Sequence, residues 1–82
     1  MFETINESVK VLVSFDKNIV KPLAFYWSNK KYEIAKVNLI HEARRGSHKI
    51  YFFSVSDSVN FYRLSFDTKT LEWNLEEIYS DG

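Results

Sequence analysis

The sequence predicts an all-β fold, and three observations lead to that class. Apolar and polar residues alternate with a period of two through most of the chain, which is the pattern of a strand with one buried face. Short polar segments with turn-forming residues separate the alternating runs. A helical pattern competes only at residues 1–9 and 75–79. We therefore expect one small domain over residues 1–82 with about six antiparallel strands.

The first strand is predicted from apolar residues two apart, namely Val9, Val11, Val13 and Phe15. Residues 1–7 precede this run, and we expect them to form a loose or helical N-terminal segment. Residues 16–22 then break the alternation, and Pro22 cannot donate a hydrogen bond to a central ladder.

The second and third strands are predicted to form a hairpin. Leu23, Phe25 and Trp27 share one face, and Tyr26 points to the other. Residues 28–31 have the composition of a short hairpin turn. The third strand contains Tyr32 and Ile34, then Val37 and Leu39. Because the step from 34 to 37 is three residues, we expect a β-bulge near Ala35–Lys36.

Three further strands are predicted in the second half. Gly46 supplies a positive φ for the turn at residues 44–47, and residues 50–55 form a densely apolar strand. Residues 57–60 and 67–70 are polar turns around a strand at 61–66, and the last strand covers 71–75. Ile78 and Tyr79 fall out of register, which indicates a second bulge or a frayed end.

Strands joined by short turns pair with their neighbours, so we expect a largely antiparallel meander. Strong twist and two bulges favour curling into a small barrel or a strongly curled sheet, which removes exposed edges. Without cysteines, the core must come from the fourteen aromatic residues and their aliphatic neighbours. The predicted core comprises Val11, Val13, Phe25, Trp27, Tyr32, Ile34, Val37, Phe53, Tyr62, Leu64, Phe66, Trp73 and Leu75.

Charge and composition restrict the function classes. A net charge of zero argues against a strongly basic nucleic-acid binder. The charge is uneven, because residues 16–50 carry eight Lys/Arg against three Asp/Glu, and residues 51–82 carry two against six. This asymmetry indicates a basic and an acidic face, or cancels where strands interleave. Neither a spanning apolar run nor a signal peptide is present, so we expect a cytoplasmic protein without membrane contact.

Several segments resemble a known family. The spacing Pro22-x-x-Phe25-x-Trp27-x-x-Lys30-x-Tyr32-x-Ile34-x-x-Val37 is followed by residues 51–55, 62–67 and 73–79, which read YFFSV, YRLSFD and WNLEEIY. This pattern is similar to a small uncharacterised bacterial all-β family encoded near Y-family translesion DNA polymerases, over about residues 13–79. The sequence departs from the family at Asn29–Lys30, where Gly-Arg is usual, and near His41, where a Trp is expected. The resemblance implies a fold and a link to DNA damage tolerance.

The residues predict no enzyme. His41 and His48 flank the 44–47 turn and could approach Glu42, but they show no recognised metal spacing, so we expect no metal site. Alternation puts Glu72 and Glu76 on the solvent face rather than in a cleft suited to acid–base catalysis. No Gly-x-Ser-x-Gly or phosphate-cradling loop is present. We therefore expect no catalytic residues and no cofactor.

Binding remains as the expected function. The first hypothesis is a protein-interaction or accessory module, with a protein partner or homo-oligomer held by an apolar patch or an open strand edge. The alternative is a weak single-stranded nucleic-acid-binding module, in which aromatic residues stack on bases and basic residues contact phosphates. The candidate binding residues are Tyr26, Lys30, Lys31, Lys36, Arg44, Arg45, Lys49 and Phe61.

Overall fold

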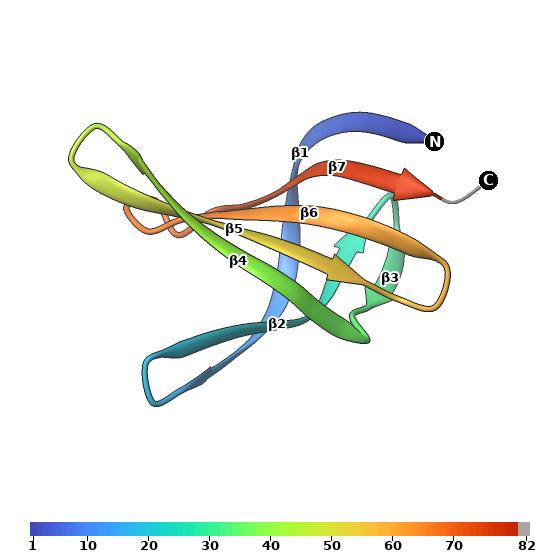
Figure 1. Cartoon of the computed structure of the whole chain (residues 1–82), viewed down its shortest axis with the longest axis horizontal. Coiled ribbons are helices and arrows are strands. Elements are labelled where there is room, and N and C mark those ends of the chain that lie inside the picture. The colour runs from blue at the N-terminus through green and yellow to red at the C-terminus, as the bar shows by residue number, and fades with distance from the viewer. Residues whose placement is uncertain (81–82) are drawn as a thin grey trace.

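The computed structural model describes residues 1–80 and shows one antiparallel sheet of seven strands (Figure 1). The strands are β1 (Phe2–Asp16), β2 (Ile19–Trp27), β3 (Lys30–Glu33), β4 (Lys36–Arg45), β5 (His48–Ser56), β6 (Asn60–Asp67) and β7 (Trp73–Ser80). Their order across the sheet is β3-β2-β1-β7-β6-β5-β4. The all-β class is confirmed, and the expected count of six strands is one too low.

The sheet consists of two meanders, β1–β3 and β4–β7, which the pairing of β1 with β7 joins. The first half of β1 pairs with β7 and the second half pairs with β2. Every strand pairs with its neighbour in sequence except β3 and β4, which lie at opposite edges of the sheet. The expected meander is therefore correct within each group, and the β1–β7 pairing joins the two groups.

The predicted third strand is divided at Ile34–Ala35. The N–H of Ile34 donates to the carbonyl of Leu23 on β2 at 2.9 Å, and the N–H of Ala35 donates to the carbonyl of Ser56 on β5, also at 2.9 Å. These two residues thus carry the chain from one edge of the sheet to the other. The prediction of a bulge near Ala35–Lys36 is wrong. It failed because a corner in the chain shifts the alternation of apolar residues by one position, just as a bulge does. The register shift on β4 lies instead at Asn38.

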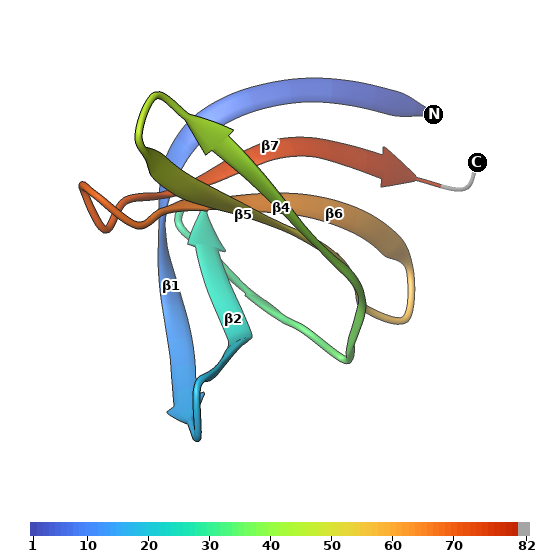
Figure 2. The ribbon, with the colours of Figure 1, turned by 60° about the vertical axis from the view of Figure 1, so that its left-hand side comes forward.

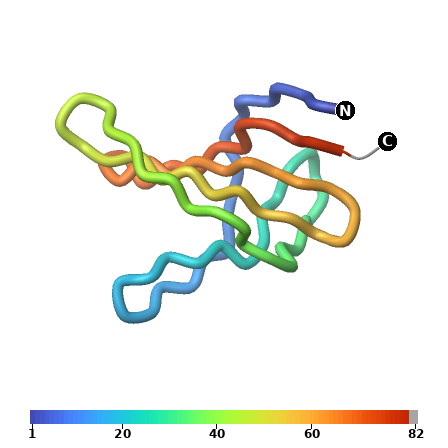
Figure 3. The backbone as a smooth tube through the Cα atoms, in the orientation of Figure 1, coloured from blue at the N-terminus to red at the C-terminus, as the bar shows by residue number. Residues whose placement is uncertain are grey.

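The sheet curls strongly but does not close into a barrel (Figure 2). The edge strand β3 has only four residues and pairs with β2 no further back than Ala24. The first residues of β2, Ile19–Pro22, therefore have only β1 as a neighbour within residues 1–80. Figures 1 and 3 show the β1–β2 and β4–β5 hairpins diverging from the body of the sheet. The strongly curled sheet is correct, and the closed barrel is not.

The N-terminus is part of the sheet. β1 begins at Phe2, which lies opposite Tyr79, so the expectation of a loose or helical segment over residues 1–7 is wrong. Asn6, at φ 52°, interrupts the alternation, because a register shift lies between Thr4 and Glu7. On β7 the register also shifts at Glu76, which confirms the second bulge expected before Ile78.

The core lies on the concave side of the sheet. All thirteen predicted core residues belong to its apolar cluster. Phe25, Phe53, Tyr62, Leu64, Phe66, Trp73 and Leu75 are buried, and Val11, Val13, Trp27, Tyr32, Ile34 and Val37 pack at its margin. Val55, also buried, was not predicted. The ring of Phe25 stacks on Tyr32 at 5.0 Å, an offset geometry that adds to the burial of both rings.

Candidate functional site

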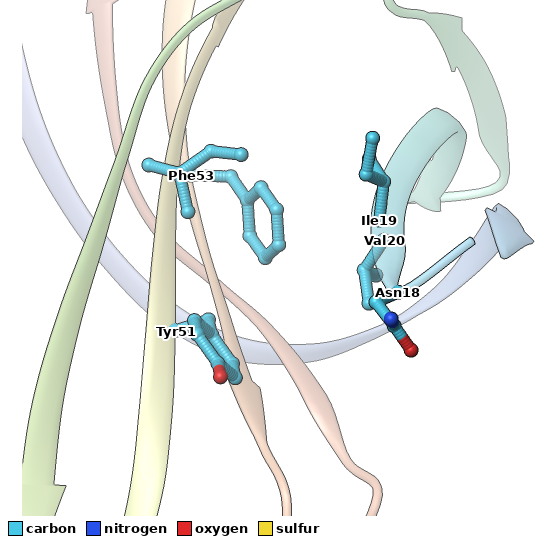
Figure 4. Close-up of a pocket in the computed structure, with 6 residues that line it drawn as sticks. Asn18, Ile19, Val20, Tyr51 and Phe53 are labelled. Carbon is cyan, nitrogen blue, oxygen red and sulfur yellow. The ribbon is translucent and has the colours of Figure 1, made fainter. Parts of the chain in front are cut away.

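An apolar cleft lies where the sheet fails to close. Its lining comes from the start of β2 on one side and from β4 and β5 on the other, and Figure 4 shows the two walls facing each other. We call it the seam cleft, and define it by Asn18, Ile19, Val20, Ile40, Tyr51 and Phe53. Its volume is about 220 Å³. Cofactor and small-molecule pockets span about 300–1,000 Å³, so the seam cleft is better suited to a few side chains of a larger partner.

The β2 wall is positioned by a two-residue turn. Lys17 and Asn18 have φ of 48° and 71°, the left-handed conformation of a type I′ hairpin. This turn fixes the register in which Phe15 lies opposite Val20, so both side chains face the same side of the hairpin. Phe15 is 69% exposed and Ile19 is 61% exposed. The hairpin tip thus presents apolar side chains that the rest of residues 1–80 does not cover.

The opposite wall is the edge strand β4. Ile40 lies opposite the buried Phe53, which places Ile40 on the cleft side, where it is 49% exposed. The ten residues of β4 pair only with β5 within the described chain. In an antiparallel ladder, about half of the N–H and C=O groups of an edge strand point away from its neighbour. β4 therefore combines free main-chain hydrogen-bonding groups with an apolar wall.

Basic residues predominate on the two segments that form the walls of the seam cleft. The cations on the hairpin tip and on β4 are Lys17, Lys21, Lys36, Arg44 and Arg45. The carboxylates on the same two segments are Asp16 and Glu42. Glu42 is already paired with Lys49 on β5, with Nζ and Oε1 at 3.6 Å. The two segments that form the walls therefore carry more cations than carboxylates, and Arg45 also lines a separate pocket with Glu72 and Glu76.

The predicted binding residues occupy three separate regions. Tyr26, Lys30 and Lys31 line a shallow groove together with Lys10, which the sequence analysis missed. Tyr26 lies directly opposite Lys10 on β1 and opposite Lys31 on β3, so the three side chains share one face. Arg44, Arg45 and Lys49 lie at the tip of the β4–β5 hairpin, away from this groove (Figure 3).

Phe61 and Lys36 belong to a third region, on the outer face. Phe61 lies opposite Tyr79, and Tyr79 lies opposite Phe2, so these aromatic residues form a row across β6, β7 and β1. Each is about half exposed. Lys36 shares the row through Ser56, which lies opposite both Lys36 and Phe61. Phe2 and Tyr79 were missed because their alternation is hidden by the bulges at Asn6 and Glu76.

The turn after β5 is held by Asp57. Its Oδ1 accepts the N–H groups of Val59 and Asn60 at 2.7 Å each, and its Oδ2 accepts the hydroxyl of Tyr62 at 2.7 Å. Burial raises the pKa of Asp57, but the hydrogen bonds from Asn60, Tyr62 and Val59 outweigh it and hold the pKa below the usual value. Burial and the hydrogen bond to Asp57 raise the pKa of Tyr62 to about 12.

The turn after β6 uses the same device. Asp67 accepts the N–H groups of Lys69 and Thr70 and lies 3.2 Å from Nε2 of His48. Desolvation raises the pKa of Asp67, yet these N–H groups and the His48 imidazole lower it below the usual value. Both arrangements stabilise turns, and Asp67 also lines a pocket with Glu72 and Glu76.

The histidines lie apart along the β4–β5 hairpin. His41 lies opposite Phe52, whereas His48 lies opposite Arg45. Within residues 1–80, no group of three or more His, Asp or Glu side chains is close enough to hold a metal ion. Glu76 is half-buried and accepts a hydrogen bond from the Ser65 hydroxyl at 2.8 Å, and Glu72 is exposed.

The chain matches no family model, no curated protein and no solved structure. The resemblance of residues 13–79 to the family encoded near translesion polymerases thus stays a prediction. Residues 1–80 also contain no helix with the length and apolarity needed to cross a membrane.

Proposed function

We propose that the protein is a non-enzymatic interaction module that binds an extended segment of a partner protein at the seam cleft. The observation that carries the proposal is the outer edge of β4, which no strand of residues 1–80 pairs with, beside an apolar cleft. An extended segment can add to such an edge as a further strand. Its main chain pairs with β4, and alternate side chains enter the cleft.

The free energy of such binding has two sources. Each main-chain hydrogen bond contributes about 0.5–1.5 kcal/mol net. Apolar area removed from water contributes about 25 cal/mol per Å², and Ile19 and Ile40 supply such area on the two walls. Main-chain hydrogen bonds form with a strand of almost any sequence, whereas the cleft favours strands with apolar side chains at alternate positions. The site therefore binds a class of extended segments.

A matched pair of variants tests the proposal. Ile40→Lys places a charge on the cleft wall, and Val59→Lys makes a comparable change at a residue 70% exposed in the β5–β6 turn. Extended peptides selected from a random peptide library should bind the wild-type and Val59→Lys proteins, and Ile40→Lys should weaken that binding about tenfold or more. Recovery of no binding peptides, or equal binding to both variants, would contradict the proposal.

A second candidate function is weak binding of single-stranded nucleic acid at the groove around Tyr26. The observation that favours it is the position of Tyr26 between Lys10 and Lys31 on one exposed face. A stacked base contributes about 1–3 kcal/mol, and neighbouring cations contact phosphates. Lys31 also lies 3.6 Å from Glu33, which reduces the positive charge of the groove.

Oligonucleotide binding at low and moderate salt tests this alternative. Tyr26→Ala should weaken binding at both salt concentrations, whereas Lys10→Ala with Lys31→Ala should flatten the salt dependence. Absence of binding at low salt would remove nucleic acid from consideration.

A further inference from the structure

We infer that the segment bound at the seam cleft is a strand with acidic residues at both ends and apolar residues between them. The inference rests on the proposed function and adds the chemistry of the partner. It follows from how charge is distributed along β4 and the facing hairpin, from the pairing that two copies of this chain would require, and from the position of the chain's own acidic segment.

The charge of β4 is concentrated at its ends. Lys36 begins the strand, Arg44 and Arg45 end it, and all three side chains are exposed. Leu39 and Ile40 lie between them. A strand laid along this edge in either direction therefore meets cations at both of its ends and apolar side chains between.

The facing hairpin repeats the pattern. Lys17 and Lys21 flank the apolar pair Ile19 and Val20. The one carboxylate on this tip, Asp16, lies opposite Ile19 at the end of β1. Cations thus flank the apolar residues along both segments, and carboxylates at the ends of a bound strand are complementary to them.

A second copy of the chain does not suit the edge. If two β4 strands paired antiparallel about their middle, Lys36 of one copy would face Arg45 of the other at both ends of the interface. Parallel pairing would set Lys36 against Lys36. Like charges directly opposite each other destabilise a strand pair, so β4 is protected from pairing with itself.

The acidic segment of the chain itself does not fit either. Glu72, Glu76 and Glu77 lie on or just before β7, which is hydrogen-bonded to β1 on one side and β6 on the other. Trp73 and Leu75 of the same strand are buried in the core. Placing this segment along β4 would dismantle the core, so this segment is not the occupant.

Nucleic acid also carries negative charge, but the cleft offers it little to stack on. Phe53 is 1% exposed, so its ring faces are covered by the core. Tyr51 is half-buried, and the rest of the wall is mostly aliphatic, with Ile19, Val20 and Ile40. Apolar side chains from an extended peptide match this lining better than bases do.

Three short capped peptides with the same alternating valine and threonine centre test the inference. One carries paired glutamates at both ends, the second carries paired lysines, and the third carries glutamates with prolines that remove central N–H donors. Fluorescence anisotropy at low and moderate salt should show the glutamate peptide binding about tenfold tighter than the lysine peptide. Salt should narrow the difference, and the proline peptide should lose binding.

A charge-reversal pair localises the preference. Arg44→Glu with Arg45→Glu changes exposed residues at the end of β4 and should reverse or abolish the preference for glutamate. Lys10→Glu with Lys31→Glu makes the same change in net charge on the distant groove and should leave the preference intact. Equal shifts in both double variants would overturn the inference, because net charge rather than the seam would then explain the preference.

The outcomes distinguish the inference from the proposed function. Equal binding of the glutamate and lysine peptides overturns the inference and leaves strand addition supported. Binding of none of the three peptides overturns the proposed function as well. Displacement of the glutamate peptide by a single-stranded oligonucleotide, retained in the Lys10→Glu and Lys31→Glu double variant, would assign the cleft to nucleic acid and also overturn the inference.

Discussion

Burial of Tyr62, together with its hydrogen bond to Asp57, is expected to make stability depend on pH above about 10. The Tyr62 hydroxyl donates to Asp57 Oδ2 at 2.7 Å, and the ring is 4% exposed. The pKa of Tyr62 is raised from 10.0 to about 12 in the folded protein. Since one pKa unit corresponds to about 1.4 kcal/mol, the two-unit difference amounts to about 3 kcal/mol.

The sign follows from which state holds the proton more tightly. The folded pKa is higher than the unfolded one, so the contribution is complete below about pH 10. It is lost as the pH rises from about 10 towards about 12, where the folded form also ionises. Tyr62→Phe removes this dependence, and at pH 7 it also costs about 1.5–3 kcal/mol because the bond to a charged carboxylate is lost.

Urea denaturation of wild-type protein, Tyr62→Phe and Tyr79→Phe measures both effects. Tyr79 is half exposed, so Tyr79→Phe makes the same chemical change without removing a buried hydrogen bond. The free energy of unfolding of wild-type and Tyr79→Phe proteins should fall more steeply above about pH 10 than that of Tyr62→Phe. Parallel curves for Tyr62→Phe and Tyr79→Phe would refute the reasoning.

Further predictions concern the core and the turns. Trp73→Ala should lower the free energy of unfolding by about 3–5 kcal/mol, because Trp73 is buried against Phe53 and Phe66. Trp27→Ala should lower it by less, because Trp27 lies at the core margin. Equal losses of unfolding free energy in urea denaturation would show that Trp27 is a core residue. Because the pKa of Asp67 is lowered in the folded protein, its ionised carboxylate stabilises the fold at pH values above the unfolded pKa of about 4. This stabilisation is lost as the pH falls through the folded pKa. Asp67→Asn should therefore flatten the acid limb of the stability curve, and an unchanged acid limb would contradict this.

Local patterns were enough to predict most of the core. Phe25, Leu64 and Leu75 are buried because a period of two and a defined turn decide which face a side chain occupies. The left-handed Gly46 was likewise predicted, with an observed φ of 66°. These features depend on neighbours within a few residues, which the sequence displays directly.

Long-range pairing could not be predicted in the same way. A corner at Ile34–Ala35 and a β-bulge at the same place would shift the alternation of apolar residues by the same one position. Only the strands that pair with the segments on either side distinguish the two structures. The pairing of Phe2 with Tyr79 joins the two ends of the chain, and no local pattern specifies it. The strand count and the open edge depend on these non-local choices.

The seam cleft was missed for a related reason. Its lining residues come from three strands, and Ile19 lies in a segment where the alternation is broken. One signal was present, because Ile19–Val20 and Leu39–Ile40 are adjacent apolar pairs. Adjacent residues in a strand point to opposite faces, so one member of each pair needs a second apolar surface. Of the second pair, Ile40 is the member that lines the cleft, and Leu39 lies on the opposite face.

Amide hydrogen exchange, resolved along the chain with and without the glutamate-ended peptide, tests the central claim most directly. If the peptide adds as a strand, the N–H groups of β4 that point away from β5 should become protected, and signals of Ile19 and Val20 should change with them. Unchanged exchange along β4, or protection centred on the groove around Tyr26, would contradict strand addition at the seam cleft.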